Sequence, residues 1–499
     1  MGEGSLWIVA TTLVMVGVLI FMMEQSLLWR RRSTQKWPPG PTKFPFIGNL
    51  YQLNKGGELV HVTLTKMAQQ YGRIMTIWFG SQEPTIVVSD HELAWEVLVT
   101  KSSDYSSRTL PYLSRVTSAD FHTLATCDLG PYWQTLRKGL QAFTINPHNI
   151  SSQIHLQEKD IADLVLSLEE EASLNNGVVD PLPKLRRLLI LLIRRFCFGP
   201  DREFNDDLFV ERMDCALEDV IRLFGHARLI DVFEFARYIP GIGLGPFQEV
   251  KRLKQRIKEL IRPYILAHKS SNSACQNCHL NFLLSQGFTE DVVILNLFEL
   301  FMLGVDSTSA AIAWALAFVI HEEETQQKLV DEVINKLGRG RRMVGVEEVS
   351  ELEYVQAVVK ETMRMKPIAP LPVPHRAVRD SELKGTKVRE GTQVLVNLYA
   401  VLTDGRVWKE PNRFMPKRFL QSQRGEDMRA MIMGMERSFI PFGAGRRICA
   451  GMELAKPQVA LTLANLVYKF QWCSEVEGQL PDLSEDLTFV LRMKTPLVA

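Results

Sequence analysis

The sequence predicts a mainly α-helical fold with a smaller β region, organised as a single large domain. Three observations predict it: apolar residues recur at helical spacing over most of the chain, β-prone runs are short and few, and no Gly/Ser-rich or Pro-rich linker divides the chain after about residue 40. The 499 residues, 46% of them hydrophobic, can bury a large core. The net charge of +1 provides no global field that would attract nucleic acid, so no nucleic-acid partner is expected.

The first segment of the chain predicts a membrane anchor. Residues 6–23 form an apolar run, and a basic cluster follows at residues 30–36. Such a run can cross a bilayer as a slightly short or tilted helix, and the cluster places the rest of the chain on the cytosolic side. A cleaved signal peptide is disfavoured because a basic n-region and a small-residue cleavage site are both missing. We expect a transmembrane anchor over 1–29, a basic and proline-rich hinge over 30–45, and a globular domain over 46–499.

Within the globular domain, two β-prone runs at 74–79 and 85–88 predict a hairpin, and residues 394–398 predict another strand of the same small sheet. Helical periodicity predicts the other elements, in chain order: 92–98, 132–142, 156–172, 209–224, 246–268, 326–336 and 350–365.

Residues 290–320 form the longest apolar stretch of this domain. A second transmembrane span is the alternative, but Asn296, Glu299 and Asp306 interrupt the run. A long buried helix that crosses the core is therefore preferred. Gly304 lowers its helix propensity by about 1 kcal/mol relative to Ala, so we expect another group to approach the backbone there.

Residues 442–451 read F-x-x-G-x-R-x-C-x-G, with Cys449 as the only soft metal ligand of the loop. A chance match of these five positions has a probability on the order of one in ten thousand in a chain of this length. A single thiolate on haem iron favours cleavage of the O–O bond. In this loop the sequence resembles the cytochrome P450 superfamily, and the resemblance extends along nearly the whole chain.

The resemblance implies haem b with Cys449 as its metal ligand, O2, and electrons from NADPH through NADPH–cytochrome P450 reductase. It also implies an endoplasmic reticulum membrane protein with a cytosolic catalytic domain over 46–499. The glycines of the loop should let backbone N–H groups reach the sulfur. Pro457 should kink the following helix or delay its start. The residues implied in haem binding are Trp133, Arg137, His375, Phe442, Arg447, Cys449 and Gly451.

Two further motifs match the family. Glu361 and Arg364 form an E-x-x-R pair, and with Arg418 they imply a structural triad that locks the haem-binding loop. Lys417 departs from the family pattern and is tolerated if it is exposed. On the long helix, Gly304, Asp306 and Ser307 occupy the positions of the family's oxygen-activating motif, where an acid and a hydroxyl pass protons.

Leu303 and Ser307 depart from the common form of that motif, and neutral drift is one interpretation. The sharper one is that Leu-Gly-x-Asp-Ser resembles the plant P450s that close methylenedioxy bridges in benzylisoquinoline alkaloid and lignan pathways. This resemblance implies a small aromatic ortho-methoxyphenol as substrate. Ordinary hydroxylation of a plant phenolic or terpenoid remains an alternative, as does isomerisation or dehydration without oxygen. The candidate pocket residues are Leu300, Leu303, Ile368, Leu371, Val373 and Val490, with residues 103–121 as a loop over the substrate.

Overall fold

The computed structural model describes residues 37–80, 83–143, 145–199, 206–225, 228–239, 242, 244–270, 277–338, 343–420, 437–476 and 478–499. The predicted anchor at 1–29 and the first part of the hinge lie outside these ranges, and their assignment stays a prediction.

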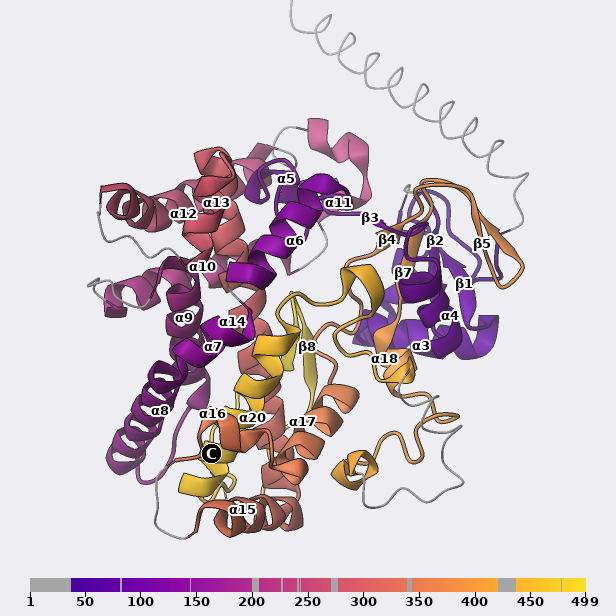
Figure 1. Cartoon of the computed structure of the whole chain (residues 1–499). Helices are drawn as coiled ribbons and strands as arrows, with labels where there is room; N and C mark the ends of the chain where they lie inside the picture. The colour runs from indigo at the N-terminus through magenta and orange to yellow at the C-terminus, as the bar shows by residue number, and fades with distance from the viewer. Residues whose placement is uncertain are drawn as a thin grey trace, which may run out of the picture.

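Helices form most of the structure (Figure 1). The longer ones are α3 (Val60–Tyr71), α6 (Pro131–Phe143), α8 (Ile154–Leu174), α9 (Pro181–Phe198), α10 (Asp206–Phe224), α12 (Leu244–Ser270), α14 (Glu290–His321), α15 (Glu323–Leu337), α17 (Glu353–Met365) and α20 (Met452–Lys469). The shorter ones are α2 (Leu50–Leu53), α4 (His91–Trp95), α5 (Ser114–Thr117), α7 (Pro147–Ser152), α11 (Leu229–Val232), α13 (His279–Ser285), α16 (Val346–Val349) and α18 (Leu398–Leu402).

The strands form one five-stranded sheet in the order β1-β2-β7-β4-β3 and two hairpins, β5–β6 and β8–β9. Their bounds are β1 (Ile74–Ile77), β2 (Thr85–Val88), β3 (Ser107–Arg108), β4 (His375–Arg376), β5 (Ser381–Leu383), β6 (Thr386–Val388), β7 (Gln393–Val396), β8 (Glu485–Leu487) and β9 (Leu491–Met493). β2 pairs antiparallel with β1 and parallel with β7, with Val87 opposite Leu395. The predicted hairpin and its third strand are therefore confirmed, although Leu398 begins α18 instead of ending the strand.

The mainly α-helical prediction is confirmed. Six of the predicted helices match α6, α8, α10, α12, α15 and α17 to within a few residues. The predicted helix 92–98 instead divides into α4 and a π-helical turn over residues 96–100, and α9 was not predicted. α20 runs from Met452 through Pro457, so the expected late start of this helix is wrong.

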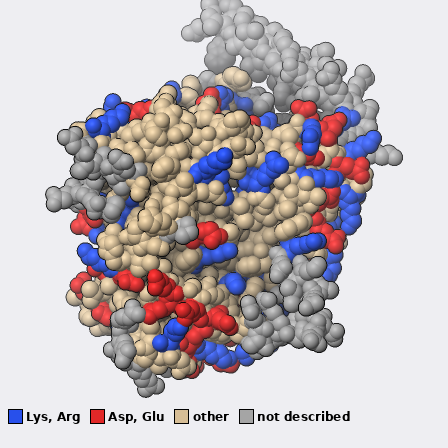
Figure 2. All heavy atoms as spheres, viewed as in Figure 1, with Lys and Arg blue, Asp and Glu red and all other residues tan. Residues whose placement is uncertain are grey.

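α14 crosses the core, with α9, α12, α17 and α20 packed around it. It is also the one helix in the described part of the chain that is apolar and long enough to span a membrane, but 83% of its apolar window is buried within the protein. The prediction of a buried core helix is confirmed. The five-stranded sheet lies to one side with α3, α4 and α18, on the right in Figure 1. On the face shown in Figure 2, acidic and basic side chains are interspersed with a largely uncharged surface.

Candidate active site

The cysteine loop is held by its own backbone and by a close approach to its neighbour. Cys449 N donates to Phe442 O at 3.0 Å, which closes the loop. Gly445 has a φ of +69°, and a Cβ there would lie 1.7 Å from Leu98 O. Only glycine fits such a contact with positive φ. Gly445 is thus required for packing against the 96–100 turn, instead of serving the sulfur as the sequence suggested.

The Cys449 thiol receives hydrogen bonds from the backbone N–H groups of Gly451 and Met452, where α20 begins. The residue keeps an exposed surface, but the protein around it raises the pKa of the thiol by desolvation. The two N–H groups and the charge of Arg137 oppose that rise. Desolvation outweighs these groups, so the pKa of the thiol stays raised, but two N–H groups and one guanidinium are placed to stabilise a negative charge on the sulfur.

Arg447, which belongs to this loop, reaches across to the segment that precedes α6. Its guanidinium donates to Ser106 O at 3.0 Å and to Cys127 O at 2.7 Å. The same group lies 5.3 Å from the centre of the Trp133 ring. Arg447 therefore ties together the two ends of the segment 106–127.

Two more guanidinium groups converge on the same region. Arg137 donates from α6 to Ile448 O at 3.0 Å, next to the thiol. Arg108, in β3, donates to Val373 O at 2.6 Å and lies 3.4 Å from His375 Nε2. Sequence reasoning did not find Arg108, because a lone arginine in a loop carries no motif.

His375 is buried in β4 and close to Arg108. Its Nδ1 lies 2.7 Å from Tyr105 O, and burial together with the charge of Arg108 lowers the pKa of His375 to about 3. The imidazole is therefore neutral at physiological pH. With both ring nitrogens next to protein groups, its predicted contact to the cofactor stays a prediction.

The arginine cluster fits an anionic group. Within the described residues, no carboxylate forms an ion pair with Arg108, Arg137 or Arg447, although the charge of Asp128 acts on Arg447, and Arg108 Nε is buried without a hydrogen-bond partner. Burial and the charge of Arg447 lower the pKa of Arg108 to about 9. Buried cations are costly unless they are paired. The two propionates of haem b would supply negative charge to these arginines, and Cys449 would offer a thiolate ligand, so the residues present fit this cofactor.

The predicted triad comes together away from the cysteine loop. Glu361 and Arg364 are completely buried and paired at 2.8 Å, and Arg418 Nε lies 3.1 Å from Glu361. Their remaining donors bond carbonyl oxygens at residues 402, 409, 410, 411 and 413, and the carboxylate accepts from the N–H of residue 415. The triad therefore fixes residues 402–418, not the cysteine loop directly as expected. Lys417, which departs from the family pattern, is exposed, and this is the condition under which we expected the departure to be tolerated.

The relay acid Asp306 is 5% exposed and has a partner that the sequence did not reveal. It accepts a hydrogen bond from Arg186 of α9, which also contacts Asp214 at 2.6 Å and Glu218 at 3.3 Å on α10. Burial raises the pKa of Asp306, and the charge of Arg186 opposes that rise. Arg186 thus connects the relay acid to a neighbouring helix.

The other two predicted relay residues, Gly304 and Ser307, make contacts that stabilise or pack α14. Ser307 Oγ donates to Leu303 O at 2.6 Å, a bond to the preceding turn. A Cβ at Gly304 would lie 2.7 Å from Ile193 Cδ1, so this glycine allows α9 to pack closely against α14. The group expected to approach the backbone there is thus a side chain of α9. The roles of both residues in oxygen chemistry stay predictions.

The candidate pocket residues come from three segments. Leu303 is 40% exposed on α14, and Val373 is 39% exposed on the 368–373 loop. Leu491 N donates to Ile368 O at 2.8 Å and thereby ties the β8–β9 hairpin, with the buried Val490, to that loop. The other two residues are partly buried: Leu300 packs against the helical core and Leu371 against the cluster beside the sheet.

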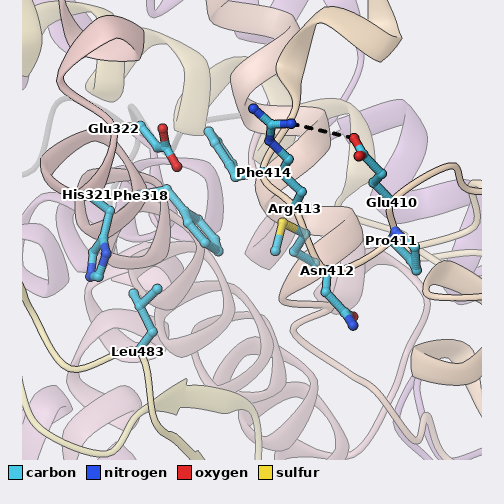
Figure 3. A pocket seen from close by; sticks show the side chains of 10 residues that line it. Phe318, His321, Glu322, Glu410, Pro411, Asn412, Arg413, Phe414 and Leu483 are labelled. Atoms are coloured by element: carbon cyan, nitrogen blue, oxygen red, sulfur yellow. Dashed lines mark ion pairs between the residues drawn. The ribbon is translucent and has the colours of Figure 1, made fainter.

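A separate surface pocket shares none of these residues (Figure 3). It lies between the end of α14, with Phe318, His321 and Glu322, and the segment 410–414. The rings of Phe318 and Phe414 stack at 4.4 Å. Because the triad holds this segment, we assign the pocket to the scaffold.

These features define a class: a helical oxygenase with one cysteine thiolate and a cluster of cations that together suit haem. The family model for cytochrome P450 matches residues 38–498. The chain belongs to the cytochrome P450 family, whose members use haem with thiolate ligation, O2 and NADPH-derived electrons from a reductase.

Named relatives and a solved structure support the same family assignment. Cheilanthifoline synthase of Eschscholzia californica is 46% identical over 100% of this chain and 98% of its own length. (S)-canadine synthase of Coptis japonica is 47% identical over 93% and 92%. A zebrafish cytochrome P450 structure with progesterone gives a TM-score of 0.74 at 26% identity, covering 88% of this chain and 98% of that one. The predicted resemblance to the bridge-forming plant enzymes is confirmed.

Proposed function

We propose that this protein closes a methylenedioxy bridge on a small ortho-methoxyphenol of plant specialised metabolism. The observation that carries the proposal is Leu303: it presents an exposed apolar side chain on α14, one turn from Ser307, in a motif that resembles the one of the bridge-forming enzymes. A branched side chain there narrows the site, which favours a terminal O-methyl group over the edge of a ring.

The reaction balances with the family's co-substrates. The substrate loses one hydrogen from the methoxy carbon and one from the phenol, and a new C–O bond closes the ring. O2 takes up these two hydrogens, two electrons from NADPH and two protons, and leaves as two waters. When bound, haem supplies the activation of O2.

The chain's own residues control the protons and the orientation. Asp306 is placed to pass protons through its buried carboxyl group, and the charge of Arg186 opposes the rise that burial causes in its pKa. The segment 106–127, tied at both ends by Arg447, contains most of the loop 103–121 that we expect over the substrate, where it would limit access of water. An isomerase or dehydratase would not need such a relay acid, which counts against that alternative.

The test is the mass of the product. Full-length enzyme with reductase and NADPH is incubated with a panel of ortho-methoxyphenols. Products that have lost two hydrogens support bridge formation. Products that have only gained oxygen would instead establish a conventional hydroxylase, and turnover without NADPH would establish chemistry that does not use oxygen.

For the membrane, we infer contact through a surface beyond the predicted anchor. Phe46 and Tyr51 are 53% and 60% exposed, and Tyr238 and Leu244 are 87% and 59% exposed. The two segments meet through residues 79 and 80: Gly48 forms a β-bridge with Phe79, and a Cβ at Gly80 would lie 2.4 Å from Val232 Cγ1. Clustered exposed apolar side chains indicate an interaction surface. In a chain that begins at residue 30, so that the predicted anchor cannot hold the protein, charged substitutions at Phe46 and Tyr238 should lower co-sedimentation with endoplasmic reticulum membranes after a high-salt wash; unchanged co-sedimentation would contradict the inferred contact.

A further inference from the structure

Glu299 shares a face of α14 with the residues that line the proposed site. Positions 299, 303 and 307 are four residues apart, so their side chains project from one side of the helix. Leu303 is 40% exposed, whereas Glu299 is only 5% exposed. The carboxylate is therefore buried on the same side of α14 as Leu303, one turn before it.

The partners of Glu299 all come from the loop that precedes α6. Ala125 N donates to Glu299 Oε2 at 2.9 Å, and the Thr123 side chain and the Leu124 N–H also contribute hydrogen bonds. These bonds attach α14 to the segment that covers the site. They satisfy the carboxylate as an acceptor, but none of them neutralises its charge.

Among the residues that the structure describes, the hydrogen-bond partners of Glu299 carry no positive charge. Three other buried acids on the long helices, Asp160, Asp306 and Glu361, each have an arginine partner. No Lys, Arg or His within the described ranges forms an ion pair with Glu299, and burial raises its pKa to about 7. Buried carboxylates are rare unless they are paired.

Holding the loop does not itself require a charge. Asn296, one turn earlier, accepts from Leu124 N at 3.2 Å and donates to His122 O at 3.1 Å with a neutral amide. A glutamine at 299 could accept the same hydrogen bonds from the backbone. The presence of an ionisable carboxyl group here, instead of an amide, therefore needs another explanation.

We propose that Glu299 binds the protonated amine of the substrate, so that the natural substrate is a basic ortho-methoxyphenol. This rests on the proposed function and specifies its substrate class. Glu299 lies about 12 Å along the helix axis from Ser307, given the rise of an α-helix. An ammonium group held at Glu299 would place the aromatic ring beside Leu303 and direct the methoxy end toward Ser307.

The experiment compares three probes that share one ortho-methoxyphenol: a tertiary amine, its quaternary N-methyl derivative and a neutral N-acyl derivative. Equilibrium dialysis against the full-length holoenzyme gives their dissociation constants. Glu299→Gln should weaken binding of both cations at least about tenfold and change the neutral probe less than about twofold. Glu290→Gln, at the start of the same helix, should leave all three unchanged.

The outcomes separate the alternatives. Equal weakening of all three probes in Glu299→Gln would show that the residue only holds the loop, and no weakening would show no role; either result overturns the proposal. Bridge formation is scored separately as loss of two hydrogens from the neutral probe. If that product forms while Glu299→Gln has no selective effect, the proposed function stands and the substrate class fails.

The wild-type enzyme provides a second test that does not depend on folding of the variant. The quaternary probe keeps its charge at every pH, so its affinity should fall about tenfold from pH 8 to pH 6 as Glu299 takes up a proton, given its pKa of about 7. The neutral probe should show no such change. Burial raises the pKa values of the nearby Cys127 and Tyr132 to about 12, so neither titrates in this range. His122 does face this region, and the His122→Gln variant should keep the pH response; its loss there would contradict the proposal.

Discussion

The two sides of the proposed site are built differently. On the cysteine side, the chain fixes its groups through neighbours in sequence and through backbone atoms, as when Cys449 N bonds Phe442 O. On the α14 side, the two buried acids depend on elements far away in the chain: Asp306 pairs with Arg186, and Glu299 accepts a hydrogen bond from Ala125 N. Where the local backbone fixes a group, a substitution removes the group altogether. Where separate side chains from distant elements hold the groups, one of them can be substituted while the others stay in place. We therefore expect losses on the cysteine side to be complete and losses on the α14 side to be graded.

The largest effect is expected at Cys449. Cys449→Ser removes the only thiolate that the loop offers, so oxygen activation should be lost completely. The measurement is the absorbance of the reduced, carbon-monoxide-treated protein, which should lack the red-shifted Soret band of thiolate ligation. Cys473→Ser, a change at another exposed cysteine, should leave that band intact. A band of normal intensity in Cys449→Ser would overturn the assignment of the ligand.

A similar loss is expected from the buried triad, through folding instead of chemistry. Glu361→Gln leaves Arg364 and Arg418 without their shared carboxylate, and breaking a buried ion pair costs about 3–5 kcal/mol. Thermal unfolding and the yield of haem-loaded protein would measure this loss of folding stability. Arg413→Ala is the matched control, since its pair with Glu410 is 3.7 Å long and exposed, and should change neither quantity. A normal melting temperature in Glu361→Gln would remove the triad's structural role.

The cysteine loop could be predicted from sequence because its residues have fixed spacing over ten positions. The triad was also found, but not its target, because which carbonyls a buried arginine reaches depends on the folded path of residues 402–418. Arg108 was missed for the same reason: it joins the cation cluster only when β3 pairs with β4.

α9 was missed because its pattern conflicts with an amphipathic helix. Arg186, Arg194 and Arg195 lie between apolar residues and read as a break in periodicity, yet all three are less than 8% exposed. Each forms an ion pair with an acid from another element, namely Asp306, Asp206 and Asp160. Long-range pairing of this kind leaves no local signal.

An intermediate effect is expected at Arg186 on the α14 side. Asp306→Asn should lower turnover by about 100-fold, the lower range for loss of a positioned proton-transfer group.

Arg186→Ala acts through Asp306: because Arg186 lowers the pKa of that buried acid, its removal should raise the pKa further. More of Asp306 is then protonated at neutral pH, so the acid limb of the pH–rate profile should move to higher pH. Arg187→Ala, at an exposed pair on the same helix, should leave the profile in place. An unmoved acid limb in Arg186→Ala would contradict the coupling.

The smallest effect is expected at Ser307, and it distinguishes a relay from a helix contact. Ser307 Oγ bonds Leu303 O in the structure, so Ser307→Ala should lose a helix contact worth about 1 kcal/mol as well as a hydroxyl. Ser307→Thr keeps the hydroxyl and restricts its rotamers, so turnover should change less than about threefold. The informative quantity is the amount of NADPH consumed for each bridge formed. If Ser307 passes protons, Ser307→Ala should raise the amount of NADPH consumed for each bridge, and Ser307→Thr should not. If both variants keep the wild-type ratio, Asp306 serves the relay without this hydroxyl, and the departure from the common motif has no catalytic consequence.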